Sequence, residues 1–433
     1  MMRFFYDLAF SLFGIFSLPH FLMRLKQAED PDRLVRERFG IFSPDLVSRL
    51  EGPRPLWIHA VSVGEVLAVE KLIQLLLERR PEQRMVLTTV TPTGQRLARQ
   101  WERDNLCVLY FPFDLQFAVR RFFETLRPAA LLLIETEIWP NVIEEARARQ
   151  VPVVVMNGRI SERSFQLFRL SRTLFSPLLR KIQLFLVQTE KDRERLTALG
   201  VPREKVTVTG NMKLDTLDPN GVWKENRTKL RQEWGYQETD QILIAGSTHA
   251  GEEEILFRML KDLRGEGFQT KLLIAPRHIE RSVKILELAK RQGWKAVLAS
   301  QRQKSSPEVV ILDQLGKLRS LYAVADVVFM GGSLVRHGGQ NPIEPAAVRR
   351  PIVHGPWVSN FHEIYRCLGE AGGSICVNQE EELRFVLGRL LASDKEREHL
   401  GSRAYEVLEK LRGATERNFK AVDSLINLRE FVP

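Results

Sequence analysis

Short apolar runs alternate along the chain with longer segments in which apolar residues recur every three or four positions. In the first half these runs lie at 56–60, 85–90, 107–111, 130–134, 153–156 and 184–187. A second series lies at 242–245, 271–275, 309–312, 327–330, 352–354 and 374–377. Strands that alternate with helices are typical of parallel sheets built from βαβ units. The pattern predicts an α/β protein of two Rossmann-like, doubly wound domains that face each other across a cleft.

The domain boundaries are set by a change in composition. Residues 215–237 are polar and include a Pro-Asn-Gly turn signal, so they are predicted to be a linker region. The predicted domains are therefore residues 30–214 and residues 238–412. Residues 413–433 hold the last helix, which is a candidate to cross back to the N-terminal domain. Apolar periodicity predicts the two closing helices at 394–410 and 414–428.

Residues 1–25 are rich in leucine and aromatic side chains and are predicted to form a membrane-anchoring helix. Asp7 and Pro19 interrupt the run, so it is a poor match to the ~20 uninterrupted apolar residues that span a bilayer. Asp7, Ser11 and Gly14 share one stripe of this helix, which is the pattern of a helix lying in the membrane interface. A single-pass anchor and a helix packed on its own domain are the alternatives.

The net charge of +10 over 433 residues favours an anionic partner. An anionic membrane surface ranks above nucleic acid, because no zinc finger, RNA-binding aromatic motif or basic low-complexity arm accompanies the charge. We therefore predict no nucleic-acid partner. The three cysteines are unclustered, which argues against a disulfide framework and a zinc site and favours the cytoplasm.

Residues 159–181 carry six basic side chains interleaved with phenylalanine and leucine. This composition predicts a basic amphipathic helix that contacts a phosphorylated lipid or a membrane surface. A solvated helix face is the alternative. The predicted contacts are Arg159, Arg163, Arg169 and Arg172.

Glu65 follows the first predicted strand and a turn of small residues, at the start of a helix. Ligands of open α/β sheets bind at the carboxyl ends of the strands, so this carboxylate is a candidate general base. The alternative is an acidic residue that complements the helix dipole. Glu135 and Glu137 follow the strand at 130–134, and Lys213 closes the first domain; these groups are expected at the same cleft.

In the second domain, the strand at 327–330 runs into two glycine pairs and then a predicted helix start. Asn341 is predicted as the N-cap, with Pro342 in the first turn and Glu344 three positions after the cap. The glycines and the free N–H groups of the helix start favour a nucleotide phosphate. A capping box without any ligand is the alternative.

Arg277 ends another second-domain strand and has the geometry to hold a phosphate through two hydrogen bonds, although a solvent-facing side chain explains it equally well. His249 is as consistent with a turn as with a ligand contact. The D-x-D sequence at residues 30–32 precedes the first strand, the wrong place for a nucleotide-bound metal. No metal site is therefore predicted.

Six motifs occur in order on the predicted strand ends: HAVSVGE, ETEIWPN, GNMK, APRH, MGGSL and GGQNPIEPA. Together they resemble the 3-deoxy-D-manno-octulosonate (Kdo) transferases of lipopolysaccharide assembly. Each motif alone is weak, but the six in order are specific, and the resemblance covers nearly the whole chain.

The resemblance implies a GT-B glycosyltransferase that is inverting, metal-independent and without a cofactor. It implies transfer of Kdo from CMP-Kdo to the lipid A disaccharide precursor (lipid IVA) on the cytoplasmic face of the bacterial inner membrane. A GT-B transferase or epimerase that uses a UDP-sugar is one alternative. A non-catalytic protein that binds lipid at the membrane surface is the other.

The resemblance also implies roles for single residues. Glu65 matches the general base, and Glu135 and Lys213 match groups that stabilise the transition state. Family members often have an acidic residue where Lys317 stands, so only a backbone contact is implied there. The implied CMP contacts are Pro276, Arg277, Leu315, Gly316, Lys317, Asn341, Pro342, Ile343 and Glu344.

Overall fold

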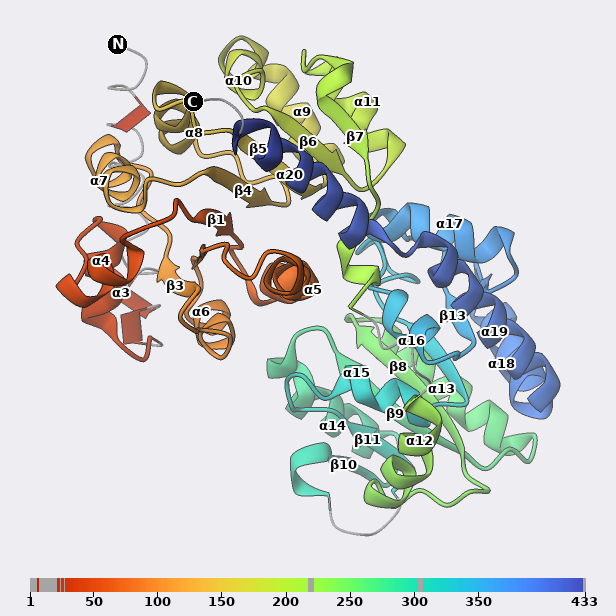
Figure 1. The fold of residues 1–433 in the computed structure, drawn as a ribbon. Helices are drawn as coiled ribbons and strands as arrows, with labels where there is room; N and C mark the ends of the chain where they lie inside the picture. The colour runs from red at the N-terminus through yellow and green to blue at the C-terminus, as the bar shows by residue number, and fades with distance from the viewer. Residues whose placement is uncertain are drawn as a thin grey trace. The chain divides into compact units, whose positions relative to one another are not determined.

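The computed structural model describes residues 6–7, 22–23, 25–26, 28–216, 222–302 and 307–430. The chain divides into two compact units (Figure 1). The first comprises Met1–Thr216 and Arg412–Pro433, and the second comprises Leu217–Leu411. The predicted pair of parallel α/β domains is confirmed, whereas the cleft between them stays a prediction.

The first unit contains one parallel sheet with the strand order β3-β2-β1-β4-β5-β6-β7. Its strands are β1 (Leu56–His59), β2 (Met85–Thr89), β3 (Leu106–Tyr110), β4 (Ala130–Ile134), β5 (Val153–Gly158), β6 (Leu184–Val187) and β7 (Val206–Val208). Its helices are α3 (Pro31–Arg38), α4 (Pro44–Leu50), α5 (Val63–Arg79), α6 (Pro92–Arg99), α7 (Gln116–Leu126), α8 (Pro140–Ala148), α9 (Glu162–Leu170), α10 (Arg172–Leu179), α11 (Glu190–Ala198) and α20 (Ala414–Glu430), with 3-10 turns η1 (Arg203–Lys205) and η2 (Met212–Leu214). The order reverses between β1 and β4, which is where ligands bind in folds of this kind.

Side chains on the two faces of this sheet pack into two separate cores. Along β1, Trp57 belongs to one cluster, together with Phe122 of α7. Leu56 belongs to the other, with Val69 of α5 and Phe419 of α20. This burial on both faces explains why the strands read as continuous apolar runs. The last helix therefore packs on the N-terminal domain, beside α5.

The second unit contains a parallel sheet with the order β10-β11-β9-β8-β12-β13-β14, which reverses between β8 and β12. Its strands are β8 (Gln241–Thr248), β9 (Thr270–Pro276), β10 (Ala296–Leu298), β11 (Val309–Ile311), β12 (Val327–Met330), β13 (Ile352–His354) and β14 (Ser374–Cys376). Its helices are α12 (Val222–Glu233), α13 (Glu252–Gly265), α14 (Ser282–Arg291), α15 (Leu318–Leu321), α16 (Ile343–Ala347), α17 (His362–Glu370), α18 (Glu380–Ala392) and α19 (Asp394–Leu411). Its 3-10 turns are η3 (Ile279–Arg281), η4 (Ala299–Gln301), η5 (Tyr322–Val324) and η6 (Ser359–Phe361). The sequence pattern missed β7 and β10, which lie at the edges of their sheets and are not buried along their whole length.

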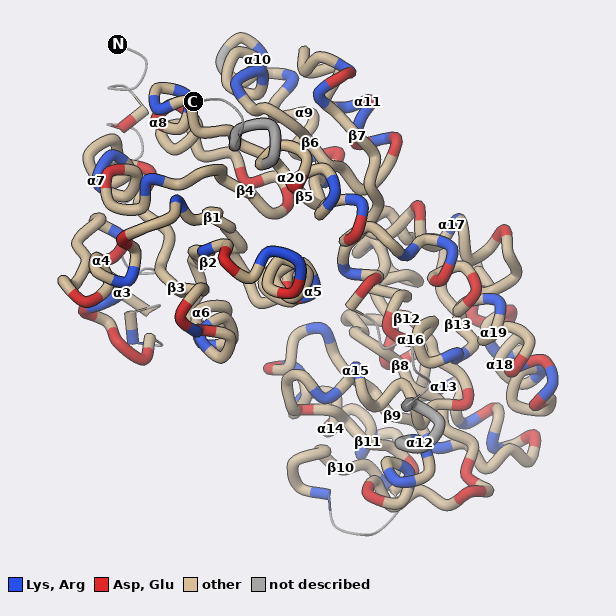
Figure 2. Tube along the Cα trace, viewed as in Figure 1, with Lys and Arg blue, Asp and Glu red and all other residues tan. Residues whose placement is uncertain are grey.

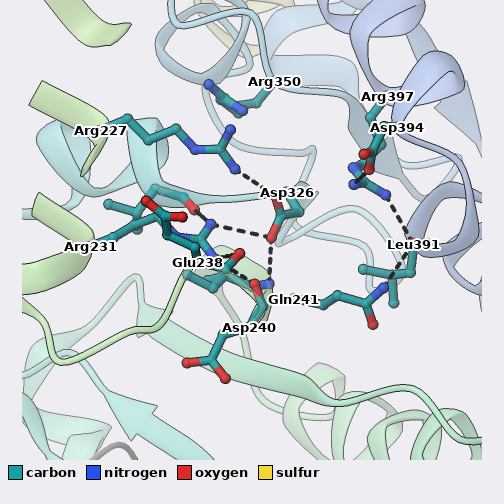
Figure 3. Close-up of polar contacts among 12 residues, drawn as sticks. Arg227, Arg231, Glu238, Asp240, Gln241, Asp326, Arg350, Leu391, Asp394 and Arg397 are labelled. Atoms are coloured by element: carbon teal, nitrogen blue, oxygen red, sulfur yellow. Dashed lines mark hydrogen bonds and ion pairs between the residues drawn. The ribbon is translucent and has the colours of Figure 1, made fainter. Parts of the chain in front are cut away.

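Residues 215–237, predicted to be a linker region, contain helix α12, and residues 217–221 of it lie outside the described residues. Two arginines of α12 bind the carboxylate of Asp326, just before β12 (Figure 3). Its Oδ1 lies 2.6 Å from Arg227 Nη2, and its Oδ2 lies 3.5 Å from Arg231 Nη1. Oδ2 also accepts the backbone N–H of Ile242 at 2.8 Å. These charged contacts attach α12 to the strand, and its mostly polar sequence gave no hydrophobic period that would predict a helix.

The predicted membrane helix at residues 1–25 lies almost wholly outside the described residues and stays a prediction. Within the parts of the chain that the structure describes, no helix is long and apolar enough to cross a membrane. Tyr6 Oη donates to Asp114 Oδ2 at 2.8 Å, and Asn141 Nδ2 donates to Asp7 Oδ1 at 2.5 Å. At these two positions the N-terminal segment contacts its own domain.

Candidate functional site

Glu65 lies in the first turn of α5, directly after β1, at the reversal point of the first sheet. The side chain is 7% exposed. Its Oε2 accepts the backbone N–H of Val61 at 2.7 Å, and its Oε1 accepts the hydroxyl of Ser62 at 2.9 Å. These two contacts orient the carboxylate at the carboxyl end of the strand. The helix-start position expected from the sequence is confirmed.

Burial raises the pKa of Glu65 above its usual value, and the negative charge of Glu135 raises it further. The Val61 N–H, the Ser62 hydroxyl and the Lys213 ammonium act in the opposite direction. These mutual effects show that the structure brings Glu65, Glu135 and Lys213 into one electrostatic cluster. A carboxylate with a raised pKa is a stronger base at neutral pH than an ordinary glutamate.

Glu135 follows β4, the strand beside β1, and its φ of 60° lies in the left-handed region. A non-glycine residue there costs on the order of 1–3 kcal/mol and is a mark of functional sites. Its backbone N–H is bonded to the Met156 carbonyl at 2.8 Å, which keeps the residue in this conformation. Its Oε1 lies 2.6 Å from Lys213 Nζ.

Lys213 lies in η2 and is placed by contacts that the sequence pattern did not reveal. The preceding residue, Met212, is fully buried, and its N–H donates to Asn157 Oδ1 at 3.0 Å. Asn157 is the second-last residue of β5 and has a φ of 54°. Two residues after the lysine, Asp215 accepts the N–H of Thr415 at 2.5 Å and so anchors the start of α20. In the sequence, the Asn-Gly pair that follows the apolar run at 153–156 is a turn signal that could have pointed to Asn157.

Glu137 is a third acid of this cluster. Burial, together with the charges of Glu65 and Glu135, raises its pKa to about 7. The residue lies before Trp139, the N-cap of α8, so it is not an acid of the first helical turn. Three carboxyl groups and one lysine therefore share the carboxyl ends of β1 and β4. Such a group can accept a proton from a hydroxyl and stabilise developing positive charge.

In the second unit, the first glycine pair has a structural use. A Cβ at Gly331 would lie 2.5 Å from the Ser247 carbonyl oxygen, so only glycine allows the ends of β8 and β12 to approach. Gly332 N–H donates at 2.7 Å to the carboxylate of Glu252, which also accepts the N–H groups of Ser333 and Leu334. These N–H groups are therefore occupied within the protein. The glycines at 331–332 serve backbone packing, and a nucleotide is not needed to explain them.

The residues predicted to contact CMP lie at the carboxyl edge of the second sheet. Pro276 ends β9, and the backbone N–H of Arg277 donates to the Thr248 carbonyl at 3.0 Å while its side chain is exposed. Helix α16 begins at Ile343, so its N-cap is Pro342 and not Asn341 as predicted. Asn341 still caps the turn, because its Oδ1 accepts the Ile343 N–H at 3.2 Å.

Two further parts of the predicted CMP site lie on neighbouring loops. Leu315, Gly316 and Lys317 form an exposed turn before α15, in which Gly316 has a φ of 78°. Burial raises the pKa of Glu344, and the charge of Arg319 on α15 lowers it. The assignment of these residues to CMP stays a prediction.

The basic segment at 159–181 was predicted to be one helix, but the structure has two. Ser171 ends α9 and precedes α10 with φ −102° and ψ 29°, which is outside the helical region. Helix α9 has no buried residues, and Leu167 and Leu170 are 58% and 84% exposed. Basic positions are visible at and beside α10 (Figure 2), where Arg172 begins the helix and Arg180 and Lys181 follow it. The side chains of Arg159, Arg163, Arg169 and Arg172 are all exposed.

Comparison with known proteins shows which family the chain resembles. Residues 33–216 match the family described as 3-Deoxy-D-manno-octulosonic-acid transferase (kdotransferase). The chain is 35% identical over 399 residues to the 3-deoxy-D-manno-octulosonic acid transferase of Haemophilus influenzae, covering 92% of each chain. It is 31% identical over 383 residues to the enzyme of that name from Bordetella pertussis, covering 85% of this chain and 87% of the relative.

A solved structure shares the fold at low sequence identity. The putative UDP-N-acetylglucosamine 2-epimerase of Listeria monocytogenes superposes with a TM-score of 0.61 at 14% identity, covering 87% of this chain and 97% of the epimerase. At that identity the likeness concerns the fold alone. The sequence relatives, which match over most of the chain, identify the family. The chain belongs to the family of 3-deoxy-D-manno-octulosonic acid transferases.

Proposed function

We propose that this protein is a GT-B type glycosyltransferase that moves Kdo from CMP-Kdo to a hydroxyl group of the lipid A disaccharide precursor, with inversion at the anomeric carbon. The observation that carries the proposal is the cluster of Glu65, Glu135 and Lys213 at the reversal point of the first sheet, in a chain of this family.

Glu65 is proposed as the general base. The acceptor oxygen attacks the anomeric carbon of Kdo, its proton passes to the Glu65 carboxylate, and the bond from that carbon to the CMP phosphate breaks. A positioned base of this kind contributes typically 10²–10⁴-fold to the rate. The ion pair of Glu135 with Lys213, held 2.6 Å apart, presents fixed charges to the charge that develops in the sugar.

The second unit is proposed to hold CMP. The exposed Arg277 offers the departing phosphate two parallel hydrogen bonds, and residues 341–344 hold the start of α16, which follows β12 in the same sheet. In this proposal cationic side chains balance the charge of the leaving group, and no metal or cofactor is required.

We further propose that the enzyme works on the cytoplasmic face of the bacterial inner membrane. The exposed leucines and arginines of α9 and of the start of α10 support this proposal. Apolar side chains that enter the interface and cations that meet lipid phosphates together favour an anionic membrane surface. The N-terminal segment is proposed as a second anchor.

The test is a mass spectrum of a bisphosphorylated lipid A precursor after incubation with the protein and freshly generated CMP-Kdo. We expect addition of one or more octulosonate units, at a rate that is about 10²–10⁴-fold lower in Glu65→Gln. The proposal would be refuted if the protein is folded, the lipid is dispersed and no octulosonate unit is added. Inhibition by UDP but not by CMP would instead support the alternative hypothesis of a GT-B enzyme that uses a UDP-sugar, which the shared fold allows. Lipid binding without turnover of either donor would support a non-catalytic protein.

A further inference from the structure

Three histidines gather at the carboxyl ends of adjacent strands of the second sheet. His249 follows β8, His278 follows β9, and His337 lies in the loop after β12. The rings of His249 and His337 are stacked, with centroids 4.1 Å apart and an angle of 15° between their planes. The ring of His278 lies 6.0 Å from that of His249, nearly perpendicular to it. His249 and His337 are 88 positions apart in the sequence, so no local pattern links the three residues.

The surrounding backbone is built to hold this cluster. Glu252 Oε2 accepts the N–H of His249 at 2.9 Å and the N–H of Gly332 at 2.7 Å, so one buried oxygen ties two of the loops together. Gly332 has a φ of 66°, and a Cβ there would lie 3.1 Å from the His249 ring. Gln340 Nε2 lies 3.1 Å from His249 Nε2. The ring is therefore fixed before any ligand arrives.

The charges around His249 are mainly positive. Burial, together with His337, His278, Arg281 and Arg277, lowers its pKa to about 4. The Arg281 guanidinium is already paired with Glu253 at 2.9 and 3.0 Å. Among the residues that the structure describes, the Arg277 side chain has no such carboxylate partner.

The negative groups near the cluster are accounted for. Glu252 uses its carboxylate on backbone N–H groups, and Glu280, which lies 3.4 Å from His278 Nδ1, is 74% exposed in its side chain. The described residues contain no group of three metal-binding side chains here or elsewhere. Stacked rings repel each other when both are protonated, whereas an oxyanion beside them would stabilise the proton. The cluster thus has the chemistry of an anion site.

We propose that His249, His337 and His278, with Arg277, form a subsite that binds an oxyanion of the sugar-nucleotide donor and takes up a proton when it does so. The oxyanion is the phosphate of the nucleotide or the carboxylate of the sugar acid. The proton comes from solvent and goes to an imidazole nitrogen. The bound anion offsets the repulsion between that new positive charge and the neighbouring cationic groups. This proposal rests on the proposed function for the identity of the donor.

The experiment is isothermal titration calorimetry of the full chain with CMP, with free Kdo added to the CMP complex, and with inorganic phosphate. Each titration is repeated in buffers of different ionisation enthalpy, which reports the protons exchanged, and between pH 6 and 8.5. The variants are His249→Asn, His337→Asn and the control His399→Asn, whose ring is exposed on α19. Thermal melts establish that each variant is folded.

We expect proton uptake with CMP or on addition of Kdo, and affinity that rises as the pH falls, by up to about tenfold per pH unit for one proton. Uptake with CMP alone assigns the phosphate, and uptake only with Kdo assigns the carboxylate. Both site variants lose the uptake, and His399→Asn keeps it. Uptake with inorganic phosphate in a protein that does not bind CMP would support the anion site and refute the proposed donor.

The inference is overturned if CMP and Kdo bind without proton uptake, or if folded His249→Asn and His337→Asn proteins take up protons like the wild type. Those results leave the transferase proposal intact, since the donor would still bind. Absence of binding by CMP, Kdo and phosphate would overturn both.

Discussion

Replacing Glu65 by glutamine tests the proposed general base. The amide oxygen can keep only one of the two hydrogen bonds, to the Val61 N–H or the Ser62 hydroxyl, that the carboxylate accepts at 2.7 and 2.9 Å. A hydrogen bond to a charged group contributes about 1.5–3 kcal/mol. The neutral side chain also removes the burial cost that raises the pKa of Glu65. We therefore expect a small net loss of about 0–2 kcal/mol in the free energy of unfolding.

The expected loss of turnover is much larger than this change in stability. Loss of a general base lowers kcat by about 10²–10⁴-fold, which corresponds to about 2.7–5.4 kcal/mol of activation free energy. Unfolding could mimic a hundredfold loss only if about 1% of the protein stayed folded, which a marginal change in stability does not produce. The variant is therefore expected to bind CMP normally and to melt near the wild-type temperature.

The assay is the initial rate of Kdo addition to the lipid precursor by mass spectrometry, with calorimetry of CMP binding and a thermal melt on the same preparations. Glu78→Gln is the matched control, because Glu78 is exposed on the same helix. A folded Glu65→Gln protein with kcat within about threefold of wild type would remove Glu65 from the role of base, since the amide cannot accept the proton.

The pH dependence follows from the same cluster. The wild-type rate should fall as the pH drops through the raised pKa of Glu65, because only the carboxylate form accepts a proton. Since Glu135 raises that pKa and Lys213 lowers it, the acidic limb of the kcat profile should move to lower pH in Glu135→Gln and to higher pH in Lys213→Met; no movement in either variant would contradict the proposed coupling. Asp326→Ala should cost about 3–5 kcal/mol of unfolding free energy, because two guanidinium groups lose their buried partner. Chemical denaturation measures this loss, with the exposed Asp394→Ala as control, and equal stability of the two variants would refute the role given to the Asp326 network.

Local pattern was sufficient where burial is uniform along a segment. The runs that predicted β1 and β12 are buried on both faces, so all of their residues except His59 are apolar, and their ends are sharp. The closing helices, α19 and α20, were likewise predicted nearly to their observed ends. Pattern failed for α12, because its attachment is through two arginines, and for the start of α16, where Asn341 caps a turn one residue before the N-cap Pro342.

The amino-acid sequence by itself determined the two α/β domains, the places where strands end, and the residue types at those ends, because these follow from local periodicity and turn chemistry. Only the tertiary structure decided which strand ends are neighbours. The reversal between β1 and β4 brings Glu135 near Glu65, and the contact of Glu135 with Lys213 spans 78 positions. The clamp of Glu252 and the stacked histidines depend in the same way on the reversal between β8 and β12. Such contacts are set by the order of strands in a sheet, which no local pattern of side chains encodes.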